Sequence, residues 1–276
     1  IRDKEYGLQK KPGKTRCLLF GDSFTFGEGV ADGQRFADIV ENKVPNLEII
    51  NFGMPGYGID TELVLYEMVA KQFEHDCVIV AANWLDAERD FSQIYSDGIV
   101  DVKKAKPLAA GVRGNTTLIA RSDKRLATRW PLSNQSYFIA YLQYQWLRKE
   151  LATELAKTDL KVWRSLNDYI FRSRGAEEKH HIEERTKAIL RTFVGSARQQ
   201  GAKFIVINID PDEPMLFLGE IDPEIKYYSY QHQLESLSQA QPLRFTYDFH
   251  FTAATHRAIG EWLSLDLANW LQSSTK

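Results

Sequence analysis

Short apolar runs alternate along this chain with segments whose apolar residues recur at helical spacing. The runs have the length of strands, and the other segments have the repeat of amphipathic helices. The predicted strands are residues 16–21, 47–52, 77–82, 203–209 and 243–247, and the predicted helices are 34–44, 60–73, 181–200 and 253–271. Strands that alternate with helices predict an α/β fold, in which a parallel sheet is covered on both faces and binds ligands at the carboxyl ends of its strands.

The first predicted strand leads into a turn that carries a serine, since residues 18–27 read LLFGDSFTFG. A serine hydroxyl is a weak nucleophile until a base takes its proton, and a strand-to-helix turn holds it at the sheet edge where a histidine can reach it. Gly21 permits a backbone conformation that a Cβ would oppose. Because Gly-Asp-Ser also occurs in ordinary turns, Ser23 by itself leaves the structural and the catalytic interpretation open.

The far end of the chain supplies the groups that a serine nucleophile needs. Asp248 lies two residues before His250, just before the last predicted helix. A histidine held in one tautomer by a carboxylate is the base of serine hydrolases, and the order Ser, Asp, His is one of several that give the same geometry. The sequence therefore predicts Ser23 as the nucleophile, His250 as the base and Asp248 as its partner.

Four sequence blocks in this order resemble the GDSL or SGNH hydrolases, a family of esterases, lipases and carbohydrate deacetylases. The blocks are Gly21-Asp22-Ser23, Asn51-Phe52-Gly53, Ala81-Ala82-Asn83-Trp84 and Asp248-Phe249-His250. The resemblance implies a flavodoxin-like, three-layer α/β/α fold with a five-stranded parallel sheet. It also implies an oxyanion hole made by the backbone N–H groups of Ser23 and Gly53 and the side-chain amide of Asn83. This chemistry requires no metal or organic cofactor.

The resemblance covers almost the whole chain, so we expect a single domain over 1–276 with a large insertion at about 84–180 that is long enough to form a lid. Within the insertion, residues 133–157 have helical periodicity with an aromatic face, which we interpret as a packing face, with substrate stacking as the alternative. A second insertion contains a predicted helix near 224–239.

Composition and cysteine content narrow the partners and the compartment. A formal net charge of -2 argues against an electrostatic nucleic-acid surface. No stretch approaches a membrane span of ~20 apolar residues, and no signal peptide is visible. The entry into the first strand resembles bacterial SGNH proteins with an upstream membrane anchor, which favours an exported, extracytoplasmic domain. Cys17 and Cys77 are expected to be buried thiols, and a bridge is the alternative, because the family's strand order makes their strands neighbours.

These observations lead to a serine esterase that hydrolyses O-acyl esters, such as acetyl esters of a glycan or of a small molecule. Two alternatives stay open. An O-acyltransferase would use the same serine chemistry with a sugar hydroxyl as acceptor. An inactive glycan-binding module on the same scaffold is suggested by Ala81 and Trp84, which replace the usual Gly and Asp of the family, and by the Asp-x-His spacing, which is one residue shorter than the commonest form.

Overall fold

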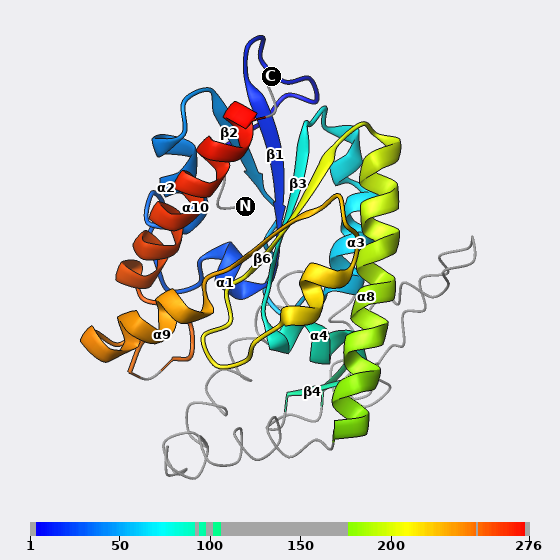
Figure 1. Cartoon of the computed structure of the whole chain (residues 1–276), viewed down its shortest axis with the longest axis vertical. Coiled ribbons are helices and arrows are strands. Elements are labelled where there is room, and N and C mark those ends of the chain that lie inside the picture. The colour runs from blue at the N-terminus through cyan, green and yellow to red at the C-terminus, as the bar shows by residue number, and fades with distance from the viewer. Residues whose placement is uncertain (1–3, 92–93, 98–101, 106–175, 247, 274–276) are drawn as a thin grey trace, which may run out of the picture. The chain divides into compact units, whose positions relative to one another are not determined.

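The structure is a computed structural model that describes residues 4–91, 94–97, 102–105, 176–246 and 248–273. Five strands form one sheet in the order β2-β1-β3-β6-β7, and every neighbouring pair is parallel (Figure 1). The strands are β1 (Thr15–Phe20), β2 (Leu47–Asn51), β3 (Cys77–Ala82), β6 (Lys203–Asn208) and β7 (Lys226–Ser229). The predicted five-stranded parallel sheet is confirmed.

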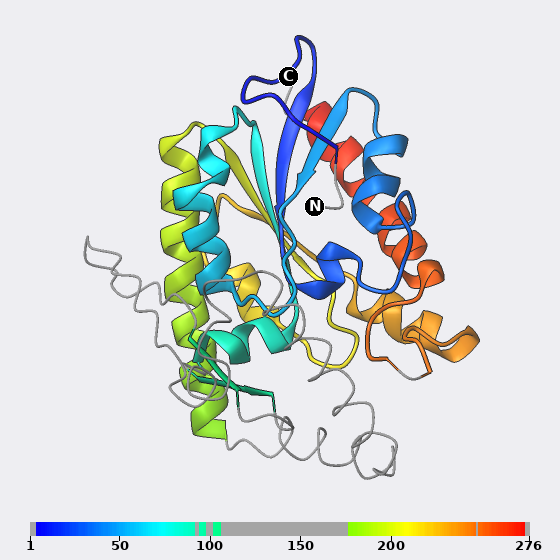
Figure 2. The same ribbon diagram turned by 180° about the vertical axis from the view of Figure 1, so that it is seen from behind.

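Helices cover both faces of the sheet, which makes the three layers. Helices α2 and α10 lie on one face, and α3 and α8 lie on the other, as the two opposite views show (Figures 1 and 2). The helices are α1 (Ser23–Phe26), α2 (Phe36–Lys43), α3 (Ile59–Met68), α4 (Trp84–Phe91), α8 (Ala176–Gln199), α9 (Gln231–Ala240) and α10 (Ala253–Ser273), with short 3-10 helices at Ala70–Gln72 and Leu216–Glu220.

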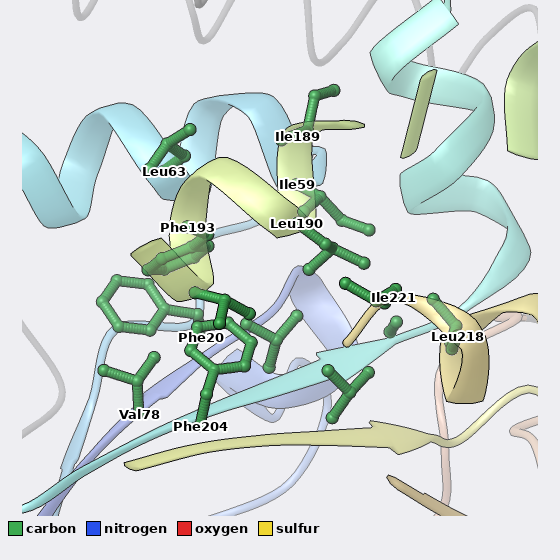
Figure 3. Packing of buried hydrophobic residues seen from close by; sticks show 14 of the residues in the cluster. Phe20, Ile59, Leu63, Val78, Ile189, Leu190, Phe193, Phe204, Leu218 and Ile221 are labelled. Carbon is green, nitrogen blue, oxygen red and sulfur yellow. The ribbon is translucent and has the colours of Figure 1, made fainter. Parts of the chain in front are cut away.

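Alternate side chains of each strand enter the two apolar layers. In β1, Leu18 and Phe20 belong to the layer beneath α3 and α8, whereas the residues between and before them belong to the layer beneath α2 and α10. Figure 3 shows Phe20 with Phe193 of α8 and Phe204 of β6, and the Phe193 ring lies 5.3 Å from that of Phe20 and 5.2 Å from that of Phe204. Because both faces are covered, the strands are apolar runs rather than alternating ones.

The fifth strand differs from the one predicted. It is β7, whereas residues 243–246 contribute no strand to the sheet, and Arg244 only forms an isolated antiparallel bridge with Phe251. The prediction of a strand at 243–247 is therefore wrong, and the helix predicted near 224–239 begins at Gln231 because the preceding residues form β7. Residues 226–229 and residues 243–247 both contain amino acids that favour strands, and residues 226–229 form the fifth strand because they pair with β6.

The two cysteines are paired. Cys17 of β1 lies directly opposite Cys77 of β3 in the strand register, both are fully buried, and their sulfur atoms form a disulfide. The expectation of two free thiols is therefore wrong, and the alternative, a bridge between neighbouring strands, is what the structure contains.

The chain divides into two compact units, of which the second comprises residues 92–108 and 116–181. The described part of this second unit includes an antiparallel hairpin of β4 (Ile94–Asp97) and β5 (Val102–Ala105). The helix predicted over 133–157 lies outside the described residues, so the lid stays a prediction. None of the described helices combines the length and the apolar character needed to cross a membrane.

Candidate active site

The turn after β1 places Ser23 at the carboxyl end of a central strand. Asp22 caps the short helix α1 by accepting a hydrogen bond from the N–H of Phe24 at 2.9 Å, and Ser23 is the first residue of that helix, 3% exposed. Gly21 has a φ of +155°, and a Cβ there would lie 2.1 Å from Thr25 Oγ1. Both the backbone conformation and the close approach therefore require glycine at this position.

His250 and Asp248 form a pair in spite of their short spacing. Asp248 Oδ1 accepts a hydrogen bond from His250 Nδ1 at 2.5 Å and a second one from the backbone N–H of His250 at 2.9 Å. A carboxylate can only accept, so Nδ1 carries a proton, and in the neutral imidazole Nε2 is the nitrogen that can accept one. His250 is 6% exposed, and its Nε2 is buried without a hydrogen-bond partner among the described residues.

The histidine lies against the nucleophile turn. The ring of Phe24, the residue after Ser23, is 5.4 Å from the His250 ring and 4.5 Å from that of Phe251. On the same turn, the N–H of Glu28 donates to the carbonyl of Ser23 at 3.0 Å, and Glu28 Oε2 lies 3.5 Å from His250 Nε2. Residues more than two hundred positions apart are thus brought together at one edge of the sheet.

Asn83 follows β3 at the same edge, and Asp86 holds its backbone and its side chain. The N–H of Asn83 donates to Asp86 Oδ2 at 3.1 Å, and Asn83 Oδ1 accepts from the N–H of Asp86 at 3.2 Å. These bonds orient the side-chain amide, and its Nδ2 is buried with no hydrogen-bond partner among the described residues. A buried donor of this kind is uncommon in native proteins and suggests a ligand.

Asp210, after β6, ties the loop of Asn83 to the neighbouring loop. Its carboxylate accepts from the N–H of Trp84 at 2.8 Å, from that of Asp212 at 2.8 Å and from that of Glu213 at 3.1 Å. Burial raises the pKa of Asp210, against the opposite effect of these three hydrogen bonds. Neither Asp86 nor Asp210 was predicted as a site residue. The role of Asp210 depends on a contact between loops, whereas Asp86 lies only three residues after Asn83 and its contacts are local.

Gly53 is held close to the nucleophile turn, but its N–H is occupied. It donates to Asn51 Oδ1 at 2.8 Å, and Asn51 in turn donates to the carbonyl of Thr25 at 2.8 Å. A Cβ on Gly53 would lie 2.5 Å from the backbone nitrogen of Phe26, which explains the glycine. The predicted oxyanion role of Gly53 therefore requires this bond to break. Gly56 of the same loop has a φ of +79°, and its N–H has no partner among the described residues.

The described residues contain no group of three or more His, Cys, Asp or Glu side chains arranged to hold a metal ion. The polar groups gathered here are a serine, a histidine paired with a carboxylate, and an amide whose nitrogen has no hydrogen-bond partner in the described part of the chain. This set can activate a hydroxyl nucleophile and bind a developing negative charge.

No protein-family profile matches the sequence, and no curated protein matches it either. Solved structures do match. The crystal structure of TesA is 12% identical, with 92% of this chain and 99% of that chain covered and a TM-score of 0.50. The psychrotrophic esterase EstA from Pseudoalteromonas sp. is 10% identical, with 94% and 100% covered and a TM-score of 0.50. A member of the lipolytic protein G-D-S-L family from Veillonella parvula is 13% identical, with 91% and 97% covered and a TM-score of 0.47. The first two likenesses establish the fold.

Proposed function

We propose that this protein is a serine esterase of the SGNH type, which hydrolyses O-acyl esters through Ser23, His250 and Asp248. The observation that carries the proposal is the pairing of Asp248 with His250 beside the turn of Ser23, with His250 Nε2 free of hydrogen bonds to the described residues. The fold shared with the esterase EstA and the four sequence blocks support the same reaction.

In the acylation step, His250 Nε2 takes the proton of Ser23 as the serine oxygen bonds to the ester carbonyl carbon. The alcohol then leaves, and its oxygen receives that proton from Nε2. A water molecule repeats the sequence on the acyl-enzyme: His250 takes its proton, the acid departs and Ser23 is regenerated. Asp248 keeps the proton on Nδ1 and stabilises the imidazolium that forms in each step.

The developing oxyanion would be bound by the N–H of Ser23 and by Asn83 Nδ2, which is buried and has no hydrogen-bond partner among the residues that the structure describes. A third donor would come from the loop after β2, either Gly53 after release from Asn51 or Gly56, whose N–H is free of partners within the described residues. The loss of one such donor typically lowers kcat about 100- to 1,000-fold.

We propose an acetylated glycan as the substrate class. The sequence blocks are similar to those of a family that includes carbohydrate deacetylases, and an exposed aromatic ring lies next to the base. The Phe249 side chain is 41% exposed, and its ring stacks on His250 with the centroids 4.3 Å apart. An exposed ring at this place offers an apolar face to a sugar or to an acyl chain.

Release of p-nitrophenol from p-nitrophenyl acetate, and release of acetate from an acetylated xylan, test the proposal with the wild type and with Ser23→Ala. Ser264 provides a matched control, because it is also a buried serine, 6% exposed, but lies in α10 and donates to the carbonyl of Gly260. We expect Ser23→Ala to lose activity and Ser264→Ala to retain it.

A fluorophosphonate probe gives a second, substrate-independent readout, because it bonds covalently to an activated serine. We expect mass spectrometry to locate the adduct on Ser23 in the wild type and to find none in His250→Ala. Folded wild-type protein that neither hydrolyses these esters nor reacts with the probe would contradict the esterase proposal.

A further inference from the structure

A second carboxylate lies at the side of His250 opposite Asp248. Glu28 Oε2 is 3.5 Å from Nε2, and the Glu28 side chain is 47% exposed. A hydrogen bond from its N–H to the carbonyl of Ser23 at 3.0 Å ties its backbone to the nucleophile turn, and Gly27 and Gly29 on either side have φ values of +77° and +86°. The turn that carries the nucleophile therefore also presents this carboxylate to solvent.

The surroundings of His250 show which part of a substrate would meet Glu28. Asp248 occupies Nδ1, and the rings of Phe24 and Phe249 pack against the imidazole at 5.4 and 4.3 Å. Within the described part of the chain, Glu28 is the charged group that lies within ion-pair distance of Nε2. In serine hydrolases the base returns its proton to the oxygen of the leaving alcohol. A group this close to Nε2 is consequently a neighbour of the alcohol part of the ester, not of its acyl part.

A carboxylate in this position selects for hydrogen-bond donors. It has acceptor atoms only, so it pairs with a hydroxyl group carried next to the ester oxygen and repels an anionic substituent. Hydrogen bonds to a charged group are also stronger than neutral ones. A simple alkyl alcohol offers no donor and would leave the carboxylate with water alone.

We infer that Glu28 is a specificity-determining residue that accepts a hydrogen bond from a free hydroxyl on the alcohol part, so that esters of polyols are preferred over esters of simple alcohols. This inference rests on the proposed esterase activity. It narrows the substrate class to partially acylated polyols, in which a hydroxyl lies beside the acylated oxygen.

Glycerol monoacetate and n-propyl acetate are the probes, because both have a three-carbon alcohol and only the first carries free hydroxyls. We expect the wild type to prefer glycerol monoacetate in kcat/KM, and Glu28→Ala to lower the ratio of the two kcat/KM values about tenfold or more. Glu28→Gln keeps an acceptor oxygen without the charge, so its ratio should lie between those of the wild type and Glu28→Ala. The ratio cancels any general effect of Glu28 on the imidazolium, which both esters share.

Glu235→Ala is the matched control. Glu235 is an exposed glutamate of α9 that also lies beside a histidine, with its Oε2 3.7 Å from His232 Nδ1. Its ratio should equal that of the wild type. The inference is overturned if the wild type shows no preference, or if Glu28→Ala lowers both esters by the same factor. A larger loss on acetylcholine than on glycerol monoacetate would assign Glu28 to a cation and also overturn it. Failure of the esterase proposal is distinguished by the probe, which would then not label Ser23.

Discussion

The substitution Asn83→Ala tests whether the side-chain amide of Asn83 serves catalysis or stabilises the fold. Asn83 Nδ2 is buried without a partner in the described structure, which costs the folded protein about 1–3 kcal/mol. The substitution also removes the bond from the N–H of Asp86 to Asn83 Oδ1 at 3.2 Å, worth about 0.5–1.5 kcal/mol. The same N–H still donates to the carbonyl of residue 83 at 3.1 Å, so no new unpartnered group arises.

Removing the buried amide stabilises the folded variant, and losing the hydrogen bond to Asp86 destabilises it by a similar or smaller amount. We therefore expect the free energy of unfolding of Asn83→Ala to lie between about 0.5 kcal/mol below and about 2.5 kcal/mol above that of the wild type. Since roughly 2–4 °C correspond to each kcal/mol in a chain of this size, the midpoint of thermal unfolding should fall by no more than about 2 °C. At the same time kcat for p-nitrophenyl acetate should drop about 100- to 1,000-fold, because the oxyanion loses a donor.

Thermal unfolding followed by circular dichroism and steady-state kinetics on the same preparations measure both quantities. Asn208→Ala is the matched comparison. Asn208 is a buried asparagine at the end of a neighbouring strand, β6, but its Oδ1 accepts from the N–H of Asp210 at 2.8 Å and its Nδ2 lies 3.4 Å from Ser229 Oγ. It should lower the midpoint. If Asn83→Ala unfolds at a clearly lower temperature, or retains more than a tenth of kcat, the amide is structural and the reasoning is refuted.

Three further predictions concern stability. Arg16→Met should lower the free energy of unfolding by about 3–5 kcal/mol in urea titrations, since it leaves Glu48 buried without its cation; adding Glu48→Met should recover part of the loss, and no loss would contradict the pairing. Replacing Cys17 and Cys77 by alanine should cost about 4 kcal/mol for a sequence separation of 60 residues, with little further change on addition of reductant, whereas wild type that is indifferent to reductant would contradict the bridge. Burial lowers the pKa of His75, so the stability that the neutral imidazole contributes is complete above pH 6.5 and is lost as the pH falls below that value. The thermal unfolding midpoints of the wild type and His75→Gln should therefore converge at low pH. A difference between the midpoints that stays constant with pH would refute this.

The layers of the fold could be predicted from the sequence because their signals are local. A strand such as β3 is a continuous apolar run, and α10 repeats apolar residues along one face, so each is visible in its own residues. The fifth strand was missed for the opposite reason. Residues 226–229 form a short, partly buried strand at the sheet edge, which gives little local signal, and its pairing with β6 is a contact between distant segments.

The residues of the candidate site likewise divide into those with a local sequence signal and those without one. Ser23, His250 and Asp248 belong to short local patterns, and the structure places them at one edge of the sheet. The hydrogen bond of the Gly53 N–H was not predicted, although the sequence carries a local signal for it. An asparagine side chain commonly accepts from the N–H two residues later, as Asn51 does here. Glu28 had none: its position beside His250 exists only after two distant segments of the chain meet.

The departure at Trp84 bears on whether the site is active, since it is one of the three features that suggest an inactive binding module, with Ala81 and the short Asp-x-His spacing. In the structure, two carboxylates hold the segment that contains Asn83 and Trp84. Asp86 binds the backbone and side chain of Asn83, and Asp210, from a segment 126 residues away, binds the N–H of Trp84. A loop held by two buried carboxylates keeps the amide of Asn83 oriented while its Nδ2 stays unpartnered in the described structure. A buried donor without a partner among the described residues is available to a ligand, so the departure at Trp84 leaves in place the amide that the proposed esterase requires.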